Sequence, residues 1–565
     1  MEKIVLNPVI WAKENFLLDF QILITNISKS KGNIIVEIET RDVEKSRYHS
    51  IVLVSSYISK LNNYDKKVSV NIIDYEKICV SFSIEEITQN FHYSFYELIL
   101  VFNIDGKEYH IPATGVDSIF KKRYLKIRKY YLNKKKNRVV FPTLGYYDFL
   151  NFFVDDRKKI DNFFHTHMEY LIAGIHRRRL FKEQKNKVLL FEKDLEYAQD
   201  NSFALFQWVQ ENKTKNNYYY IINKNAKQVD KLLPYKKKII YSGSFRYYWH
   251  ILTAGLLISS ETPSNAYLDN NRKYATQFVK KLLYKKKNFM LQHGVIAFKK
   301  LGTDVDPVMN AKSGIIDYFV SSNVEEQKII IENLNYSSEK VPILGLTRWD
   351  KFLKNKLNTN NYGNILYVPT WRQWLFNLSD DEFLMSDYYL EINNLLTDEF
   401  LIQFLKEKDL KLDVYLHPFM QRFVNDFNIE NKYIHLLSSD KYDLSILINN
   451  AAMLITDYSS VAWDFAIQRK PVVFYQFDRE RYEEEIGSYI NLNNMIIGSS
   501  FETTENVVLE VLKIINNDFQ LSLQVMNNIE ILFGNLYDNI SYKTYQFIES
   551  RILGGNRNWK QKTLK

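Results

Sequence analysis

The chain has 565 residues, with 40 Tyr and 37 Phe but only 17 Gly and 10 Pro. That length predicts about three or four domains, and the aromatic-rich, glycine-poor composition excludes collagen-like and low-complexity proteins. The single cysteine, Cys79, excludes an intramolecular disulfide and a cysteine-based zinc site, and it suits a reducing compartment.

The formal net charge is +9 at pH 7, and basic residues gather at 121–138 (KKRYLKIRKYYLNKKKNR) and 280–287 (KKLLYKKK). Such runs can bind anionic lipid headgroups, a polyanionic substrate or nucleic acid, and a solvated helix face is the plain alternative. We find no signal-peptide pattern at the start and no apolar window near the ~20 residues of a membrane span. The sequence therefore predicts a protein that is soluble or lies on a membrane surface.

Residues 1–117 are predicted to form an all-β, sandwich-like accessory domain. Short β-branched and aromatic runs such as NIIVEIET, ICVSFSI and YELILVFNI alternate with Asn, Asp, Lys and Gly. No catalytic side chains cluster there, so the sequence assigns this domain no function.

Residues 118–185 are predicted to be a basic helical connector. His165, His167 and His176 lie in it, but a helix directs residues two apart to different faces, and residues nine apart share a face only loosely. Unrelated histidines are therefore favoured over a metal site.

From residue 186 onward, apolar runs alternate with amphipathic helices. This alternation predicts two successive parallel α/β domains, over 186–335 and 336–545, before a basic tail at 546–565. A cleft between two such domains is the expected ligand site.

Four predicted strands end in polar residues, where parallel sheets bind ligands. These ends read LQHG (291–294), VPTWR (368–372), LHP (416–418) and TDYSS (456–460). Each is a weak signal alone, but four strand ends with two histidines and an arginine favour one common site.

The TDYSS segment is the most informative of the four. Residues 453–456 form a short apolar run, helical spacing begins at Ser460, and Pro471 ends the helix before a second strand at 472–477. Ser459 and Ser460 stand at the N-cap and first turn, where hydroxyls and free backbone N–H groups favour a phosphate. An ordinary helix cap is the alternative interpretation.

Two other motif classes receive less support. The chain has no Gly-rich dinucleotide fingerprint, so a nicotinamide enzyme is not expected. Asp304 and Asp306 form an Asp-x-Asp pattern, but they lie in a Gly/Pro segment that reads as a plain loop.

These motifs together resemble the CDP-glycerol glycerophosphotransferase family, the teichoic-acid polymerases and primases of Gram-positive bacteria and related capsule polymerases. The similarity covers roughly residues 186–545 and rests on QHG with FKKLG, PTWR, LHP and above all ITDYSSVAWDFAIQRKPVVFYQFD. The family commonly has WHGTPLKKIG where this chain has QHGVIAFKKLG, a departure that bears on donor or acceptor specificity.

The resemblance implies an α/β GT-B architecture, in which two Rossmann-like domains face a cleft and the second binds a CDP-polyol. It implies transfer of glycerol phosphate or ribitol phosphate to the terminal hydroxyl of a lipid-linked teichoic-acid or capsule-type acceptor, with release of CMP. His293 is the expected base, His417 is expected to bond the phosphates or assist proton transfer, and Arg372 is expected to neutralise them.

The remaining substrate-binding residues expected from the resemblance are Gly294, Lys299, Lys300, Thr370, Pro418, Thr456, Asp457, Ser459, Ser460, Asp464 and Asp478. No metal, no cofactor and no nucleic acid is expected, and the predicted location is peripheral, on the cytoplasmic face of the cell membrane. A GT-B enzyme that uses a nucleotide sugar and a non-catalytic membrane-surface scaffold remain alternatives. The polyol, the acceptor, the choice between primase and polymerase, and the oligomeric state stay open.

Overall fold

The computed structural model divides the chain into two compact units, Met1–Leu180 with Asp269–Leu282 and Phe181–Leu268 with Leu283–Lys565. The structure describes residues 4–5, 21–30, 32–41, 48–55, 67–68, 71–72, 78–89, 94–104, 107–112, 131–133, 135, 137–144, 150–157, 168, 171–172, 174–176, 178, 181–214, 217–267, 277–301, 307–354, 363–375, 378–416, 420, 423, 427, 429, 431–438, 441–534, 536 and 538–554.

The first unit contains two mostly antiparallel sheets, as expected for an all-β domain. One has the order β1-β9-β8-β12-β11-β10 with β4 and β5 attached, and the other has the order β2-β3-β7-β6. The elements are β1 (Ile4–Val5), β2 (Gln21–Ser30), β3 (Asn33–Arg41), β4 (Tyr48–Ser55), β5 (Lys67–Val68), β6 (Asn71–Ile72), β7 (Ile78–Ser83), α2 (Ile84–Gln89), β8 (Ser94–Ile104), β9 (Lys107–Pro112), β10 (Tyr131–Asn133), β11 (Arg138–Leu144) and β12 (Leu150–Asp156).

The boundary predicted at residue 117 differs from the structure. Strands β10 to β12 belong to the larger sheet, with β12 antiparallel to β8, so the stretch 118–185 is not simply a helical connector. Leu150, Phe152 and Val154, which stand at every second position along β12, are at most 1% exposed, as residues on one face of a strand are when that face is buried. The basic character of the neighbouring residues concealed this alternation.

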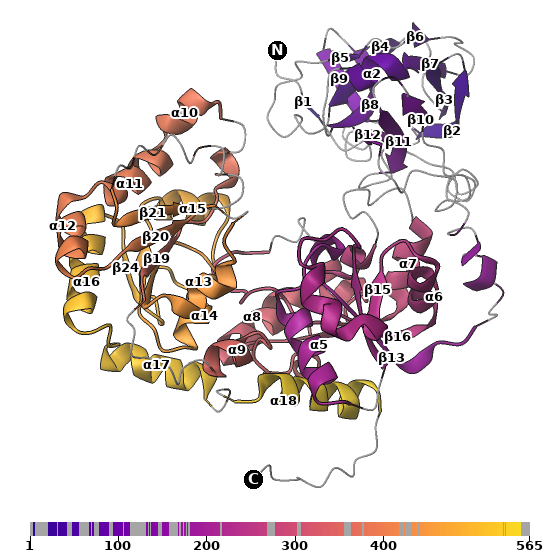
Figure 1. Ribbon diagram of the computed structural model, residues 1–565. Coiled ribbons are helices and arrows are strands. Elements are labelled where there is room, and N and C mark those ends of the chain that lie inside the picture. Colours follow the sequence, from indigo (N-terminus) through magenta and orange to yellow (C-terminus); the bar gives the residue numbers. More distant parts are fainter. Residues whose placement is uncertain are drawn as a thin grey trace. The chain divides into compact units, whose positions relative to one another are not determined.

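The second unit begins with a Rossmann-like domain (Figure 1) whose six strands are all parallel. The first strand is central, the second and third lie on one side of it and the fourth to sixth on the other. The strands are β13 (Gln184–Phe191), β14 (Asn217–Ile222), β15 (Ile239–Tyr241), β16 (Ala254–Ser259), β17 (Lys287–Met290) and β18 (Tyr318–Phe319). The helices are η4 (Lys193–Leu195), α5 (Asn201–Glu211), η5 (Val229–Lys238), α6 (Phe245–Thr253), η6 (Pro263–Ala266), η8 (Pro307–Met309), η9 (Ala311–Ser313), α8 (Val324–Leu334), η10 (Ser338–Lys340) and α9 (Trp349–Lys354). Helix α7 (Gln277–Lys285) is shared, since its residues up to Leu282 belong to the first unit and the rest to the second.

A second Rossmann-like domain repeats the same strand order, again with parallel pairs only. Its strands are β19 (Ile365–Val368), β20 (Leu412–Tyr415), β21 (Ile434–Leu437), β22 (Met453–Thr456), β23 (Val472–Tyr475) and β24 (Ser499–Phe501). Its helices are η12 (Gln373–Leu375), α10 (Asp380–Leu384), α11 (Asp387–Leu396), α12 (Glu399–Glu407), α13 (Leu444–Asn450), α14 (Val461–Ala466), α15 (Arg479–Glu485), α16 (Thr504–Asn516) and α17 (Leu523–Phe533). The prediction of two Rossmann-like domains, the α/β GT-B class, is confirmed.

The last helices carry the chain back to the first of these two domains. Helix α18 (Ile540–Phe547) packs beside α5, where the Tyr545 ring lies 5.4 Å from that of Trp208, and the π-helix η14 (Ile548–Ile552) continues from α18. Ile548 and Ile552 complete the core formed by β13 and β14. The residues described after 545 therefore form part of this core, and the rest of the predicted basic tail lies outside the described residues.

In parallel sheets of this order, ligands bind at the carboxyl ends of the strands, near the point where the order reverses. That point lies between β13 and β16 in one sheet and between β19 and β22 in the other. The predicted site residues after β17, β19 and β22 follow strands at or next to these points.

Candidate active site

The loop after β17 has a backbone fixed by contacts to distant segments. Gln292 is buried and adopts a left-handed φ of 50°, a conformation that costs free energy for a non-glycine residue. Its carbonyl accepts a hydrogen bond from Asn201 Nδ2 (2.8 Å), and its side-chain Nε2 donates to the Val320 carbonyl (2.9 Å). The strained residue is therefore held in place from both sides.

His293, the next residue, points its imidazole outward. Its side chain is 66% exposed, and Nδ1 lies 3.7 Å from Oε1 of Glu261, which follows β16. Burial raises the pKa of the Glu261 carboxyl, while the charge of His293, when protonated, lowers it. The main chain is anchored separately, because the His293 carbonyl accepts a hydrogen bond from Arg348 Nη1 (2.6 Å). A reachable imidazole on a fixed backbone beside a carboxylate has the arrangement of a general base.

Gly294 brings this loop against the TDYSS turn. A Cβ atom at Gly294 would lie 2.5 Å from Ser460 Oγ and 3.0 Å from Ser460 Cβ, and such contacts are too short for a stable packing. Glycine is thus favoured by the close approach of two predicted motifs, which are separated in the sequence by more than 160 residues and come from different Rossmann-like domains.

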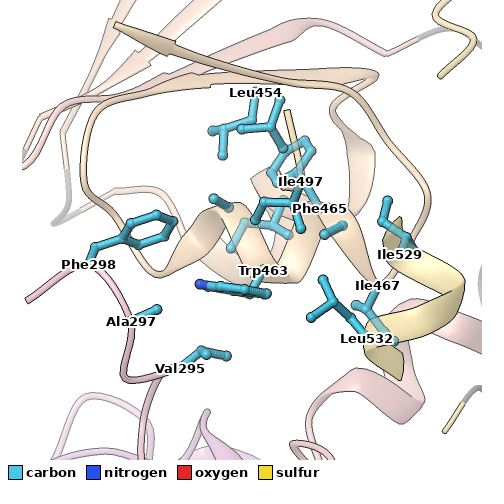
Figure 2. Close-up of a cluster of buried hydrophobic side chains, with 14 of the residues drawn as sticks. Val295, Ala297, Phe298, Leu454, Trp463, Phe465, Ile467, Ile497, Ile529 and Leu532 are labelled. Carbon is cyan, nitrogen blue, oxygen red and sulfur yellow. The ribbon is translucent and has the colours of Figure 1, made fainter. Parts of the chain in front are cut away.

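The rest of the loop docks on the second Rossmann-like domain. Val295, Ala297 and Phe298 join a buried apolar cluster with Trp463 (Figure 2). The backbone of the loop also binds the second domain, because Tyr482 Oη donates to the Phe298 carbonyl (2.9 Å). The loop that follows β17 of the first sheet thus contributes to the core of the second domain.

Lys299 and Lys300 follow this anchored segment, and both side chains are exposed. The Lys300 N–H donates to the Gly487 carbonyl (2.9 Å), so the backbone is fixed while the ammonium groups face solvent.

A buried carboxylate also supports the loop, because Glu326 accepts the Ile296 N–H (2.6 Å). Burial raises the pKa of the Glu326 carboxyl to about 7.

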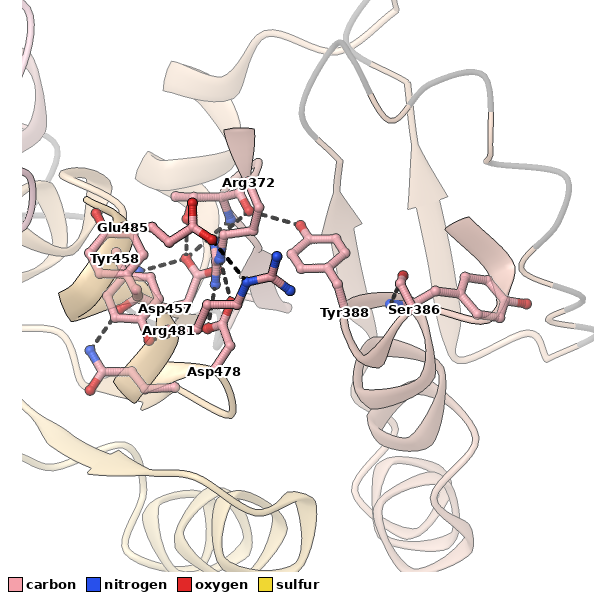
Figure 3. A network of polar contacts seen from close by, with 12 residues as sticks. Arg372, Ser386, Tyr388, Asp457, Tyr458, Asp478, Arg481 and Glu485 are labelled. Atoms are coloured by element: carbon pink, nitrogen blue, oxygen red, sulfur yellow. Dashed lines mark hydrogen bonds and ion pairs between the residues drawn. The ribbon is translucent and has the colours of Figure 1, made fainter. Parts of the chain in front are cut away.

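Arg372, after β19, is fully buried between carboxylates (Figure 3). Its Nε and Nη2 donate to Asp478 (2.7 and 3.0 Å), Nη2 lies 2.9 Å from Asp457 Oδ2, and Nη1 donates to the Thr370 carbonyl and hydroxyl. Every N–H direction of the guanidinium therefore meets a protein acceptor. Arg372, which the sequence predicts to bind phosphate, therefore lies in a cage of protein acceptors that joins the strand ends.

Aromatic rings close this cage. The guanidinium carbon lies 4.8 Å from the Tyr458 ring centre and 5.5 Å from that of Tyr482, and these two rings stack at 3.6 Å. Tyr388 adds a third ring at 5.3 Å. Such cation–π contacts are strongest when desolvated, so the cage stabilises a charge that would otherwise be costly to bury.

Thr456 and Asp457 connect β22 to β19. Thr456 Oγ1 donates to the Val368 carbonyl (2.6 Å), and Asp457 accepts from the Thr370 N–H and hydroxyl. Burial raises the pKa of Asp457, and the charge of Arg372 opposes this shift. Both predicted residues are buried and orient the turn that follows.

The serines of the turn agree only in part with a plain helix cap. Ser460 is the N-cap of α14 but makes no side-chain cap hydrogen bond. Ser459 Oγ accepts the Val461 N–H at 3.3 Å, which is long for this interaction. Since α14 has only six residues, its dipole adds less than the sequence suggested, and the serine hydroxyls are the more important groups.

Asp464 is buried and faces Arg348 and Trp349. It accepts from Arg348 Nη2 (2.8 and 3.1 Å) and from Trp349 Nε1 (2.6 Å). The prediction placed Asp464 at the substrate, whereas here its carboxylate binds the segment that links the two domains. Arg348 and Glu261 are neighbours of the site that the sequence analysis missed, because neither belongs to a recognisable spacing.

Several predicted residues lie outside the described residues: His165, His167, Asp304, Asp306, His417 and Pro418. Across the part of the chain that the structure describes, no three His, Cys, Asp or Glu side chains gather as metal ligands would. Within the same residues, no helix is long and apolar enough to cross a membrane.

Known proteins show similarity over the same region. The chain matches the family described as CDP-Glycerol:Poly(glycerophosphate) glycerophosphotransferase over residues 174–530. It is 26% identical over 374 residues to the minor teichoic acid biosynthesis protein GgaB of Bacillus subtilis (strain 168), covering 64% of this chain and 40% of that protein. It is 30% identical over 203 residues to the teichoic acid glycerol-phosphate primase of the same strain, covering 34% of this chain and 49% of the primase.

A third relative is the teichoic acid glycerol-phosphate transferase of Staphylococcus aureus (strain NCTC 8325 / PS 47), 28% identical over 249 residues, which cover 39% of this chain and 60% of the transferase. The matches thus span 40 to 60% of the length of these relatives. The solved structure of the wall teichoic acid polymerase TagF has a TM-score of 0.48 at 17% identity, covering 68% of this chain and 91% of that one. Because the family model covers more than half of the sequence, the chain belongs to the CDP-glycerol:poly(glycerophosphate) glycerophosphotransferase family.

Proposed function

We propose that this chain transfers a polyol phosphate, glycerol phosphate or ribitol phosphate, from a CDP-polyol to a hydroxyl of a lipid-linked teichoic-acid or capsule-type acceptor. The acceptor oxygen forms a bond to the phosphorus that bears the polyol, the bond from that phosphorus to the bridging oxygen breaks, and CMP leaves with the bridging oxygen. Family membership supports the reaction class, and the convergence of the His293 loop with the Ser460 turn supports the location.

His293 is the proposed base for the acceptor hydroxyl. Its exposed ring can reach an incoming group, and as it takes the proton the imidazolium is stabilised by the Glu261 carboxylate 3.7 Å away. We therefore propose that the acceptor binds on the side of the first Rossmann-like domain, where β16 and β17 end.

The phosphates of the donor are proposed to lie against Ser459 and Ser460, with Lys299 and Lys300 supplying positive charge from the facing loop. These four residues lie on the TDYSS turn and on the loop that docks beside it. Arg372 was expected to neutralise the phosphates, but its side chain already binds Asp457 and Asp478. We therefore propose a structural role for it. It keeps the turn rigid, while His417 and Pro418 remain proposed phosphate contacts.

The experiment that tests the reaction is incubation of pure protein with CDP-glycerol, CDP-ribitol and UDP-sugars, each with a lipid-linked acceptor analogue. We expect CMP release and a product heavier by one or more polyol phosphates with at least one CDP-polyol. Release of UDP instead would indicate a nucleotide-sugar enzyme. No turnover with any donor, together with tight vesicle binding, would indicate a scaffold.

We also propose a peripheral position on the cytoplasmic face of the membrane, with the basic run 121–138 as the contact. Most of that run lies outside the described residues, so the proposal rests on its charge, at about 1 kcal/mol per basic residue near an anionic surface. The protein should co-sediment with anionic but not neutral vesicles, and less so as salt rises. Changing Lys134, Lys135 and Lys136 to Glu should release it without loss of CMP release from a soluble acceptor. If this variant binds vesicles as the wild type does, the membrane contact is expected at residues 280–287 instead.

A further inference from the structure

Arg348 lies in the segment between the two Rossmann-like domains and binds both. Its Nη1 donates to Asp200 Oδ1 (2.8 Å) and to the His293 carbonyl (2.6 Å), while Nη2 donates to both oxygens of Asp464 (2.8 and 3.1 Å). Asp200 precedes α5 in the first domain, and Asp464 lies in α14, the helix that follows Ser460. One guanidinium thus joins the main chain of the proposed base to the helix of the proposed phosphate site.

The backbone of the same segment binds the loop a second time. The Arg348 N–H donates to Asn201 Oδ1 (3.0 Å), and Asn201 Nδ2 donates to the Gln292 carbonyl (2.8 Å). Thr347 Oγ1 completes the set with a bond to the Asn201 carbonyl (2.6 Å). Consecutive carbonyls of the strained loop, at Gln292 and His293, are therefore held by Asn201 and Arg348.

The Asp200 carboxylate binds Arg348 and does not cap helix α5. Asp200 is the N-cap residue of α5, yet it makes no side-chain cap hydrogen bond, although an Asp in that position normally caps the helix. Glu192 accepts the N–H groups of Asp200 (3.0 Å) and Phe203 (2.9 Å) in its place. The Asp200 carboxylate is thereby available to Arg348.

We propose that Arg348 is a positioning residue of the transfer reaction, which fixes the distance between His293 and the Ser459–Ser460 turn. The inference rests on the proposed function and adds a residue that acts through the main chain of His293. A guanidinium suits this role because it is planar and presents several donors in fixed directions, whereas an ammonium is a point charge on a flexible stem. Arg348→Lys should therefore keep the charge and lose the geometry.

The test compares Arg348→Lys and Asp200→Asn with Lys351→Met, which changes an exposed lysine on α9, the helix that begins directly after Arg348. Each folded protein is assayed for CMP release at saturating donor, for the KM of the donor, for the pH profile of kcat and for CDP binding by calorimetry. We expect Arg348→Lys to lower kcat by about 10²-fold, the cost of a misplacement near 1 Å, with KM and CDP affinity nearly unchanged. The acid limb of the pH profile should not move, because the positive charge is retained.

Asp200→Asn leaves the pair with Asp464 in place and should lower kcat by roughly tenfold, while Lys351→Met should match wild type. These results together support the proposal. A kcat within twofold of wild type in Arg348→Lys overturns it, and so does a loss that appears as weaker CDP binding alone. If Arg348→Lys fails to fold, Asp200→Asn decides the question by the same criteria. The wild-type protein is the internal control. If it releases no CMP, the proposed function itself is contradicted. If only the variants are defective, the result concerns the positioning role of Arg348 alone.

Discussion

The loop after β17 and the strand end after β19 present their charged residues in opposite ways. His293 is 66% exposed on a backbone held by Arg348 and Asn201, whereas Arg372 is fully buried, with its side chain held by Asp457 and Asp478. Both residues follow a strand of a parallel sheet, where ligands bind in such folds. Position at a strand end therefore predicts where a residue lies but not whether its side chain meets substrate or protein.

Removal of the His293 imidazole should have the largest effect on activity. His293→Ala should lower CMP release by 10²- to 10⁴-fold, the usual worth of a general base, and should leave the melting temperature and CDP affinity near wild type, because the side chain is exposed. His435→Ala is the matched control, since that histidine lies at β21 and pairs with Asp413 (3.1 Å). Turnover close to wild type in His293→Ala would exclude this residue from the mechanism.

Removing the buried guanidinium should act on stability instead. Arg372→Met leaves the buried Asp457 and the partly buried Asp478 without their cationic partner, and such a loss typically costs 3–5 kcal/mol of the free energy of unfolding. Denaturant titration followed by circular dichroism measures this loss. Arg481→Met is the control, because Arg481 is 54% exposed and its pair with Glu485 spans 3.4 Å, worth about 0–1 kcal/mol. A stable Arg372→Met that has lost CDP binding would restore Arg372 as a direct phosphate ligand.

Arg372 and Arg348 show which features of the site could be predicted from the sequence and which could not. The alternation of strands and helices, the two Rossmann-like domains and the strand-end motifs were predictable, because apolar runs and helical spacing are local patterns. The cage of Arg372 was not, since its partners Asp457 and Asp478 lie 85 and 106 residues further along the chain. Arg348 was missed for the same reason: its contacts to His293 and Asp464 span 55 and 116 residues. Strands β10 to β12 were missed because their apolar alternation adjoins a basic run.

The contact between the loop after β17 and the TDYSS turn after β22 can be tested at Gly294. In Gly294→Ala the new Cβ would lie 2.5 Å from Ser460 Oγ, and such overpacking costs about 1–3 kcal/mol. The double variant Gly294→Ala/Ser460→Gly should recover much of this stability, and the coupling between the two positions is read from a double-mutant cycle. Gly174→Ala is the control, because no atom lies within 4 Å of its added Cβ. Additive effects would show that the loop and the turn do not touch in solution.

The smallest expected change in stability concerns the serines of the turn. Ser459→Ala/Ser460→Ala should cost at most about 1 kcal/mol, the worth of one cap, because the Ser459 bond to the Val461 N–H is long at 3.3 Å and Ser460 makes no cap hydrogen bond. Affinity for CDP, measured by calorimetry, should fall by at least about tenfold, since each hydroxyl lost from a charged phosphate removes a bond worth about 1.5–3 kcal/mol. Ser522→Ala, which removes the cap of α17 (3.3 Å to the Val525 N–H), should lower stability by a comparable amount and leave CDP affinity unchanged. If the double variant behaves as Ser522→Ala does, the serines are a plain helix cap and the phosphates must be held by Lys299, Lys300 or the segment around His417.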